Sequence, residues 1–334
     1  MKKIVYTKYG SPDVIELIET EKPLPKDNQV LLKVHAASVN ILDWYHLTGP
    51  PMIRLTNGTL SKPKETSLGL DVAGRVEAVG DRVTQFQPGD EVFGIAQGSL
   101  ADYACADEHE LVRKPANVSF EAAAATPVAA LTALQGLHDK GRIQPGQKVL
   151  INGASGGVGT FAVQIAKSFE AIVTAVCSTH NLDIAHSIGA DYVIDYTRED
   201  FMTNGQLFDL IFAVNGYHSI FDYRRALSPT GIYVSAGGKL AQIIQAALVG
   251  PILSKVGRQQ LSFMGIAQVK QKNLSIIGEL LESGKVIPVI DRCYPLSATS
   301  HALQYLGARH AKGKVIITMR PDYDSSQGVN SLGY

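Results

Sequence analysis

The chain has 334 residues, of which 45% are hydrophobic and 19% are charged, and these proportions are those of a globular protein rather than a disordered one. Lys and Arg number 31, and so do Asp and Glu, so the charge balance excludes the basic footprint of a protein built to hold nucleic acid. The three cysteines, Cys105, Cys177 and Cys293, form no Cys-x-x-Cys pair, which argues against a disulfide framework or zinc ribbon and favours a cytoplasmic protein. We expect no export signal at Met1 and no transmembrane segment, because the most apolar later stretch, 240–253, is too short to span a bilayer.

Short strands separated by glycine, proline and aspartate turns dominate the first third of the chain. These strands are expected at 30–37, 71–79, 91–95 and 100–105. Because no helices alternate with them, this third predicts a β-rich domain. An alanine-rich helix is expected to follow, at about 121–137.

From that helix onward, apolar strands alternate with helices, which is typical of a doubly wound parallel sheet. Six parallel strands are expected, at 148–151, 172–177, 192–195, 208–213, 232–235 and 262–266. A helix at 270–283 and strands at 288–290 and 314–318 come after them, and we expect these strands to return to the first domain. The polar tail from Arg320 to Tyr334 receives no assigned function.

The most informative motif is a glycine-rich turn that follows an apolar strand and opens an amphipathic helix. Within it, Gly153, Gly156 and Gly159 recur at a spacing of three. Glycines let the backbone turn tightly and approach a pyrophosphate, while the following helix directs its free N–H groups at the phosphates. The motif therefore predicts a site for a nicotinamide or flavin dinucleotide.

Two other interpretations of this turn stay open. It could be a connection without a ligand, or the G-x-S-x-G nucleophile elbow of a serine hydrolase, centred on Ser155. A hydrolase would need an acid and a histidine downstream, for which Asp291 and His301 are available near the chain end. Three glycines at a spacing of three fit a pyrophosphate better.

Further short motifs accompany the glycine turn. They lie at 37–44, 69–74, 79–80, 88–92, 130–134 and 189–196. Together they resemble the zinc-independent quinone oxidoreductase branch of the medium-chain dehydrogenase/reductase superfamily, which includes ζ-crystallin-like and chloroplast-envelope quinone oxidoreductase-like proteins, up to about Met319. The resemblance implies an α/β fold with a GroES-like β-rich catalytic domain, at 1–123 and 268–334, and a Rossmann domain with a doubly wound, six-stranded parallel sheet, at 124–267.

The resemblance also implies that no metal is bound. Zinc-dependent members of the superfamily carry Cys in place of Asn40, Gly-His-Glu in place of 69–71, and a third ligand near Thr126. Their structural zinc needs four closely spaced cysteines, whereas 100–115 offers only Cys105. Without a Lewis acid to hold an alkoxide, oxidation of a simple alcohol loses its main source of charge stabilisation. Quinones and enones, which accept hydride more readily, are therefore the expected substrates.

Two residues are the catalytic candidates. In the resembling enzymes, Asn40 faces the nicotinamide and the substrate, and its amide can donate and accept hydrogen bonds; the alternative is an ordinary loop or helix-capping Asn. Tyr45 is a candidate proton donor to an enolate or quinolate, although relatives vary here and many carry Lys, so it could equally line the pocket. Asp43 is expected to be structural.

The cofactor preference is predicted from charge. An NAD site requires an acidic residue about 20 residues beyond the glycine turn. This chain has Ser178, Thr179 and His180 there, which favours NADPH over NADH. His180 is the basic candidate of that segment, and we hypothesise that 2′-phosphate binding strengthens as it protonates; the alternative is a solvated residue at a helix start. The remaining cofactor candidates, from the glycine turn or by resemblance, are Thr132, Ser155, Gly156, Gly157, Val158, Tyr196, Asn215, Gly237 and Gly238, of which the last two could form a plain turn.

The sequence thus predicts an NADPH-dependent reductase of quinones or α,β-unsaturated carbonyls. An enoyl-thioester reductase and a non-catalytic NADPH-binding protein, as lens crystallins of this family suggest, stay open. The expected partners are a small-molecule substrate and no nucleic acid. A homodimer is expected by edge pairing of the strand at 262–266.

Overall fold

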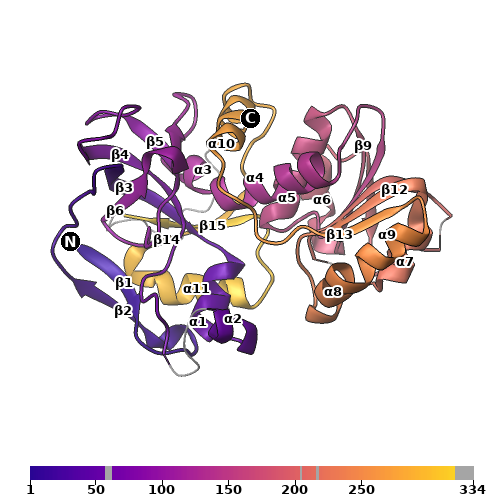
Figure 1. Ribbon diagram of the computed structural model, residues 1–334, viewed down its shortest axis with the longest axis horizontal. Helices are drawn as coiled ribbons and strands as arrows, with labels where there is room; N and C mark the ends of the chain where they lie inside the picture. Colours follow the sequence, from indigo (N-terminus) through magenta and orange to yellow (C-terminus); the bar gives the residue numbers. More distant parts are fainter. Residues whose placement is uncertain (57–61, 204, 216–217, 320–334) are drawn as a thin grey trace. The chain divides into compact units, whose positions relative to one another are not determined.

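The computed structural model describes residues 1–56, 62–203, 205–215 and 218–319 (Figure 1). The chain forms two compact units, and the predicted tail from Arg320 to Tyr334 lies outside the described residues. The first unit contains Met1–Val128, Val269–Glu282 and the described residues from Pro288 onward, and the second contains Ala129–Gln268 and Ser283–Ile287. These bounds place the first boundary five residues later than the predicted one and add the short segment 283–287 to the nucleotide-binding unit.

The first unit is built on a mostly antiparallel sheet. In the described chain its strand order is β14-β15-β3-β4-β5-β7, and β6 pairs with β3. The strands are β3 (Gln29–Val39), β4 (Asp71–Val79), β5 (Glu91–Ile95), β6 (Tyr103–Asp107), β7 (Leu111–Arg113), β14 (Ile290–Pro295) and β15 (Lys314–Thr318). The small sheet of β1 (Lys2–Tyr6) and β2 (Ile15–Glu19) stands apart. The prediction that the last strands return to the first domain is confirmed, because β15 pairs antiparallel with β3.

Helices cover this sheet and connect its strands. They are η1 (Pro12–Val14), α1 (Ile41–Thr48), α2 (Pro51–Thr56), η2 (Glu108–Glu110), α3 (Phe120–Ala124), α10 (Gln271–Glu282), η6 (Leu296–Ala298) and α11 (Thr299–Gly307). Strand β3 is buried on both faces, since Val30 and Leu32 pack in one apolar cluster while Ala37 and Val39 pack in another. The apolar residues on the two faces fix the register of β3 against β4 and β15, because a slip of one residue would exchange the faces and bury the exposed Lys33.

The second unit contains a parallel sheet. In the described chain its order is β10-β9-β8-β11-β12-β13. The strands are β8 (Lys148–Asn152), β9 (Ile172–Cys177), β10 (Tyr192–Asp195), β11 (Phe208–Ala213), β12 (Leu227–Ser235) and β13 (Gln260–Phe263). Its helices are α4 (Pro127–Leu134), which begins at the boundary, η3 (Gln135–Lys140), α5 (Gly157–Ser168), η4 (Thr179–Asn181), α6 (Leu182–Ser187), α7 (Ile220–Ala226), α8 (Leu240–Ile244), η5 (Gln245–Val249) and α9 (Gly250–Val256).

This order has a switch point at its centre. From β8 the chain proceeds outward through β9 to β10 and then returns to the other side of β8 with β11. In such sheets ligands bind outside the carboxyl ends of the strands at this reversal. The predicted α/β class, with a GroES-like unit and a six-stranded parallel sheet, is confirmed.

Some element bounds differ from the prediction. The helix expected at 121–137 is divided into α3, α4 and η3. The break between α3 and α4 falls at Pro127, which has no N–H to continue a helix and instead occupies the first position of α4. Strand β13 ends at Phe263, three residues before the predicted end.

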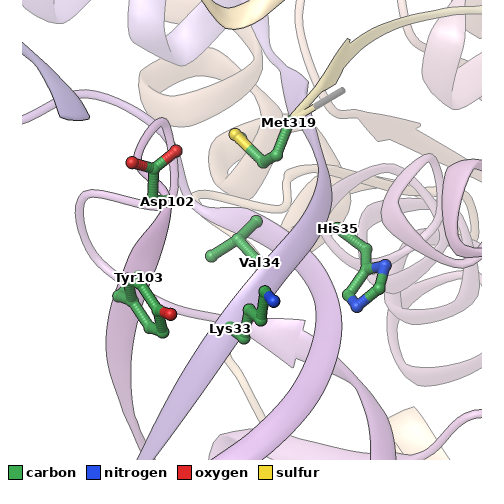
Figure 2. A pocket seen from close by; sticks show the side chains of 6 residues that line it. All are labelled: Lys33, Val34, His35, Asp102, Tyr103 and Met319. Atoms are coloured by element: carbon green, nitrogen blue, oxygen red, sulfur yellow. The ribbon is translucent and has the colours of Figure 1, made fainter. Parts of the chain in front are cut away.

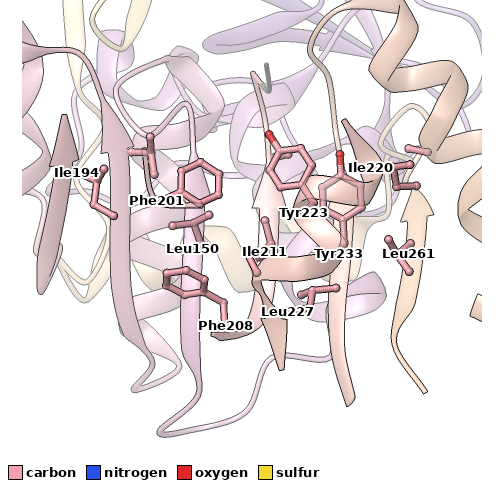
Figure 3. Close-up of a cluster of buried hydrophobic side chains, with 14 residues drawn as sticks. Leu150, Ile194, Phe201, Phe208, Ile211, Ile220, Tyr223, Leu227, Tyr233 and Leu261 are labelled. Carbon is pink, nitrogen blue, oxygen red and sulfur yellow. The ribbon is translucent and has the colours of Figure 1, made fainter. Parts of the chain in front are cut away.

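One apolar cluster holds α7, η5 and α9 against the parallel sheet (Figure 3). The rings of Tyr223 and Tyr233 stack within it at a centroid distance of 4.6 Å. Their buried hydroxyls have partners, since Asn152 Nδ2 donates to Tyr223 Oη at 2.7 Å and Gln242 Nε2 donates to Tyr233 Oη at 3.0 Å. A buried hydroxyl without a partner would cost about 1–3 kcal/mol, so these bonds let two tyrosines occupy a core.

None of the helices in the described residues combines the length and the apolar character that a membrane-spanning helix needs.

Candidate functional site

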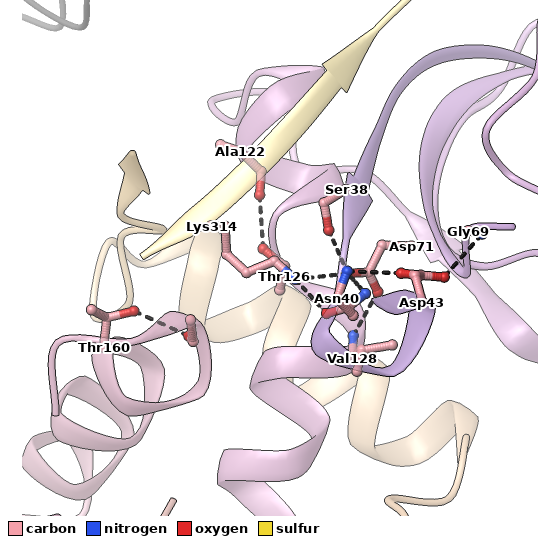
Figure 4. Close-up of polar contacts among 11 residues, drawn as sticks. Ser38, Asn40, Asp43, Gly69, Asp71, Ala122, Thr126, Val128, Thr160 and Lys314 are labelled. Atoms are coloured by element: carbon pink, nitrogen blue, oxygen red, sulfur yellow. Dashed lines mark hydrogen bonds and ion pairs between the residues drawn. The ribbon is translucent and has the colours of Figure 1, made fainter. Parts of the chain in front are cut away.

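Three polar residues from distant parts of the chain meet at one end of β3 in the first unit (Figure 4). Asn40 directly follows β3, Asp71 begins β4 and Lys314 begins β15. The strand pairing brings them together, because Val39 lies opposite Val315 and Ser38 lies opposite Asp71. All three are buried: Asp71 is 0% exposed, Lys314 3% and Asn40 8%.

Hydrogen bonds satisfy this buried group almost completely. Lys314 Nζ donates to Asn40 Oδ1 at 2.6 Å and to Asp71 Oδ2 at 3.1 Å. Asn40 Nδ2 also donates to Asp71 Oδ2, at 2.9 Å. The carboxylate of Asp71 further accepts from Ser38 Oγ at 2.5 Å and from the backbone N–H of Val128 at 2.8 Å. A buried ion pair repays its desolvation cost only with such additional hydrogen bonds, and here they are present.

Asn40 is the N-cap residue of α1, and Asp43 is the third residue of this helix. Its carboxylate accepts from the backbone N–H of Asn40 at 2.7 Å and from that of Gly69 at 3.0 Å. Burial raises the pKa of Asp43 to about 6, while the two backbone hydrogen bonds oppose this shift. The nearby carboxylate of Asp71 raises the pKa further, and Lys314 lowers it. These contacts with the backbone agree with the structural role expected for Asp43, and the interpretation of Asn40 as a helix-capping residue stays open.

Tyr45 lies further along α1 and is partly buried. Its hydroxyl oxygen accepts a hydrogen bond from Arg309 Nη2 at 2.9 Å. Arg309 follows α11 in a left-handed conformation, with a φ of 61°. Because a guanidinium only donates, the phenolic proton of Tyr45 remains free for an acceptor. Sequence reasoning missed Arg309 and Lys314, since nothing local in the sequence links either to α1.

The residues at the zinc-ligand positions of the superfamily do not fit a zinc ion. Asn40 and Asp71 are bonded to each other and to the Lys314 ammonium, which would repel a metal cation. Leu70 has no donor atom, and the hydroxyl of Thr126 donates to Ala122 O. Across the part of the chain that the structure describes, no group of three or more His, Cys, Asp or Glu side chains could hold a metal ion.

The glycine turn joins β8 to α5 in the second unit. Gly153 has a φ of 89°, and a Cβ placed on it would lie 2.9 Å from Asn215 Cβ. A Cβ on Gly159 would lie 2.1 Å from Gly153 O. Gly156 is different, since its nearest neighbour would be 3.8 Å away. The outer glycines are therefore required by the turn and its packing, whereas Gly156 leaves open space beside Gly157, where the free N–H groups of α5 begin.

The other predicted cofactor residues follow the carboxyl ends of the parallel strands. Ser178 follows β9, Tyr196 follows β10, Asn215 follows β11, and Gly237 and Gly238 follow β12. The parallel register keeps these ends level at one edge of the sheet.

The position of two of these glycines also has a backbone explanation. A Cβ on Gly237 would lie 2.5 Å from Val214 O, and Gly238 has a φ of 109°. The interpretation of these two as a plain turn therefore stays open. Thr132 lies on α4 and not at a strand end.

Asn181 links the glycine turn to the turn after β9. Its Nδ2 donates to Ser155 Oγ at 3.0 Å and to Ser178 Oγ at 3.1 Å. Asn181 Oδ1 is buried and has no hydrogen-bond partner within the described chain. A hydroxyl of a bound dinucleotide would supply the missing donor, so the residues present fit such a cofactor. Sequence reasoning placed Asn181 in this turn but gave it no role.

The corner that would discriminate NADPH from NADH contains both signs of charge. Thr179 Oγ1 donates to Asp195 Oδ2 at 2.5 Å, and this bond is the main cause of the lowered pKa of Asp195. Arg198 Nε lies 3.5 Å from the same carboxylate oxygen. His180 and Tyr196 are exposed. Arg198 is thus a second basic residue at this corner, which sequence reasoning missed because only the pairing of β9 with β10 brings the two turns together.

The acid that a serine hydrolase would need, Asp291, is bonded to other groups than a histidine. The carboxylate of Asp291 accepts from Tyr305 Oη at 2.8 Å and from the backbone N–H of Lys312 at 2.7 Å. Within the described residues, no hydrogen bond joins Asp291 to His301.

A separate pocket of about 390 Å³ lies beside β3 and β6 in the first unit (Figure 2). It is lined by Lys33, Val34, His35, Asp102, Tyr103 and Met319. None of these residues is a predicted site residue.

Two family profiles match the chain. The one described as "Alcohol dehydrogenase GroES-like domain" matches residues 26–116, and the one described as "Zinc-binding dehydrogenase" matches residues 188–317. Among curated relatives, the 2-methylene-furan-3-one reductase of Solanum lycopersicum is 35% identical over 95% of this chain and 79% of its own length. The chloroplast envelope quinone oxidoreductase homolog of Arabidopsis thaliana is 34% identical over 95% of this chain and 98% of its own length.

Solved structures agree with these matches. The quinone oxidoreductase from Coxiella burnetii is 30% identical and superposes with a TM-score of 0.83, covering 96% of this chain and 99% of its own. The Escherichia coli quinone oxidoreductase complexed with NADPH is 25% identical with a TM-score of 0.81, covering 95% of this chain and 100% of its own. The chain therefore belongs to the quinone oxidoreductase branch of the medium-chain dehydrogenase/reductase superfamily.

Proposed function

We propose that this protein is an NADPH-dependent reductase that transfers hydride to a quinone or an α,β-unsaturated carbonyl without zinc. The observation that carries the proposal is the Asn40 amide, which is held by Lys314 and Asp71 where zinc-dependent relatives place a metal ligand. An amide can hydrogen-bond an activated carbonyl oxygen but cannot stabilise a free alkoxide as a Lewis acid does. The similarity to the tomato 2-methylene-furan-3-one reductase and to the Arabidopsis chloroplast envelope quinone oxidoreductase homolog supports this substrate class.

The roles of the chain's residues follow from their hydrogen bonds. When bound, NADPH supplies the hydride. The Asn40 Nδ2 group donates to the acceptor oxygen, on which negative charge develops as hydride arrives at the conjugated carbon. Tyr45 gives its phenolic proton to the product enolate or quinolate, while Arg309 holds the phenolic oxygen. The proton of Tyr45 is then replaced from solvent.

The preference for NADPH over NADH is part of the proposal. It is supported by the turn after β9, where Ser178, Thr179 and His180 stand in place of an acidic residue. The acidic group nearby, Asp195, is already bonded to Thr179 and paired with Arg198. The Escherichia coli structure, which is complexed with NADPH, supports the same cofactor.

A homodimer is also proposed. Strand β13 is the last strand of the parallel sheet in the described chain, so one of its edges has no strand beside it. The helical segment before it carries exposed apolar residues at a spacing of four: Leu240, Ile244, Leu248, Ile252 and Val256, which are 46% to 80% exposed. Ser254 Oγ bonds the backbone of Leu261, which ties α9 to β13. The exposed stripe and the open edge together support a surface for a second copy.

A cytoplasmic location of the protein stays a prediction.

The test is oxidation of NADPH and of NADH against a panel of acceptors. The panel contains a benzoquinone, a naphthoquinone, a short enone, a crotonyl thioester and a simple ketone. We expect turnover with the quinones or the enone, a higher kcat/KM with NADPH, and no turnover with the ketone. Turnover confined to the thioester would replace the proposal with an enoyl-thioester reductase, and NADPH binding without any turnover would favour a non-catalytic role.

A further inference from the structure

We propose that Lys314 and Asp71 are positioning residues for Asn40, and that Lys314 strengthens the remaining Asn40 N–H as a hydrogen-bond donor. This inference rests on the proposed function, in which Asn40 donates to the acceptor oxygen. It concerns Lys314 because that side chain is 4% exposed and donates hydrogen bonds to both Asn40 and Asp71.

The network determines which way the amide faces. A lysine ammonium only donates hydrogen bonds, and a carboxylate only accepts them. Since Lys314 Nζ lies 2.6 Å from one end of the Asn40 amide and Asp71 Oδ2 lies 2.9 Å from the other, the first end is the oxygen and the second is the nitrogen. Rotating the amide by 180° would place two donors together and two acceptors together, each in a buried site.

This orientation leaves one donor of Asn40 available. An asparagine amide has two N–H groups, and Asp71 takes one of them. Within the described residues, the second N–H has no protein partner. The backbone of Asn40 is held as well, because its N–H donates to Asp43. Both ends of the residue are thus fixed, and the free N–H has a defined direction.

The charge of Lys314 adds a second effect. A charge-assisted hydrogen bond to the amide oxygen draws electron density away from the nitrogen and makes its N–H groups more polar. The effect is largest where water does not screen the cation, and the Lys314 side chain is buried. An uncharged residue at position 314 would remove this polarisation together with the hydrogen bond that orients the amide oxygen.

If Lys314 and Asp71 formed only a structural ion pair, the effect of replacing Lys314 would be the same with and without Asn40. Asp71 already accepts from Ser38 and Val128, and these bonds anchor it without the amide. The test is therefore a double-mutant cycle between Lys314 and Asn40 on the full chain, with kcat measured for the acceptor that the panel identifies. The variants are Lys314→Met, Lys314→Arg, Asn40→Ala and Lys314→Met/Asn40→Ala, with the exposed Lys285→Met as the matched control.

We expect Lys314→Met to lower kcat by about 10- to 100-fold, with less than about a 2-fold change in the Kd for NADPH, and Lys314→Arg to recover part of the loss. In the Asn40→Ala background, Lys314→Met should change kcat by less than about 2-fold, because the group that it positions is gone. Fold losses that multiply in the double variant would overturn the proposal. Since Lys314→Met leaves Asp71 buried without its cation, Lys314→Met/Asp71→Asn carries the same kcat prediction in a neutral site.

A second readout separates this inference from the proposed function. The side-chain amide signals of Asn40 in a ¹H–¹⁵N correlation spectrum are identified by their loss in Asn40→Ala. We expect them to shift in Lys314→Met, much less in Lys314→Arg, and not at all in Lys285→Met. If the wild-type protein reduces no acceptor, the proposed function fails while this shift still supports the positioning; if the signals are unchanged in Lys314→Met, the positioning fails whatever the activity.

Discussion

Lys314 Nζ donates to Asn40 Oδ1 across 2.6 Å, although the two residues are 274 positions apart in the sequence. Strand β15 makes this contact possible, because it pairs antiparallel with β3 and places Val315 opposite Val39. The contact assembles a buried cation, a carboxylate and an amide at the end of β3. Its stability and its chemistry can be tested separately.

Removing the cation from this group should destabilise the protein strongly. We expect Lys314→Met to lower the free energy of unfolding by about 3–5 kcal/mol, because Asp71 then remains buried without a compensating charge. The double variant Lys314→Met/Asp71→Asn should lose less, since no unpaired charge remains. Urea denaturation followed by circular dichroism measures both values, and an equal loss in the two variants would contradict the explanation.

The Asn40 amide should act on the chemical step and not on cofactor binding. We expect Asn40→Ala to lower kcat by about 100-fold, as loss of one hydrogen-bond donor to a developing oxyanion does. The Kd for NADPH, measured by fluorescence titration, should change by less than about 2-fold. A rise in Kd with unchanged kcat would instead give Asn40 a role in binding.

Tyr45 should matter as a proton donor. We expect Tyr45→Phe to lower the kcat for an enone on the order of 100-fold, because the ring remains but the phenolic proton is lost. The solvent deuterium isotope effect on kcat should fall in this variant if the phenol transfers a proton in the rate-limiting step. Unchanged kcat and an unchanged isotope effect would leave Tyr45 as a residue that lines the pocket.

The corner after β9 and β10 should determine the preference for NADPH. We expect Arg198→Ala to raise the KM for NADPH by about 5-fold at pH 6 and at pH 8, with little change for NADH, because only NADPH carries the 2′-phosphate. His180→Ala should raise it more at pH 6 than at pH 8, since histidine gains charge in acid. If the KM for NADPH is the same as in the wild type at both pH values, His180 has no part in phosphate binding. The exposed Lys285→Met serves as the control.

Asp43 should make stability depend on pH in a specific direction. Burial raises its pKa to about 6, whereas an unfolded aspartate has a pKa near 3.8. The unfolded state therefore releases its proton first as pH rises, so the contribution of Asp43 is fully present below pH 4 and is lost as pH rises to about 6. In Asp43→Asn, the free energy of unfolding should decline less between pH 4 and pH 6 than in the wild type, although it is lower overall because one backbone N–H loses its acceptor. An identical slope in both proteins would contradict the raised pKa.

The exposed stripe on α8–α9 should be needed for self-association. We expect the wild type to be a dimer by multi-angle light scattering at micromolar concentration, and Leu248→Lys/Ile252→Lys to be a folded monomer, because two charges would be buried at the contact. Leu24→Lys, which changes an equally apolar residue that is 86% exposed in the first unit, should stay dimeric. A monomeric wild type would contradict the proposed interface.

Local patterns in the sequence determined much of this protein. Runs of apolar, β-branched residues marked the strands of both sheets, because such residues favour an extended, buried backbone whatever they later pair with. The glycine turn was recognisable because only glycine tolerates the positive φ of Gly153 and the close backbone contact at Gly159. The sequence also showed that positions 40 and 70 carry Asn and Leu instead of the zinc ligands Cys and His of zinc-dependent members, because a metal site requires particular residue types whatever its geometry.

The tertiary structure alone decided which of these residues act together. Lys314 and Asp71 reach Asn40 through the pairing of β15 and β4 with β3, and Arg198 reaches the turn after β9 through β10. Arg309 reaches Tyr45 because α11 returns to the first unit. Local sequence patterns reflect the backbone preferences of neighbouring residues, whereas strand pairing is set by the burial of surfaces that are far apart in the chain. The partners that orient the catalytic candidates therefore had to be found in the folded molecule, even though the strands that carry them were predicted from the sequence.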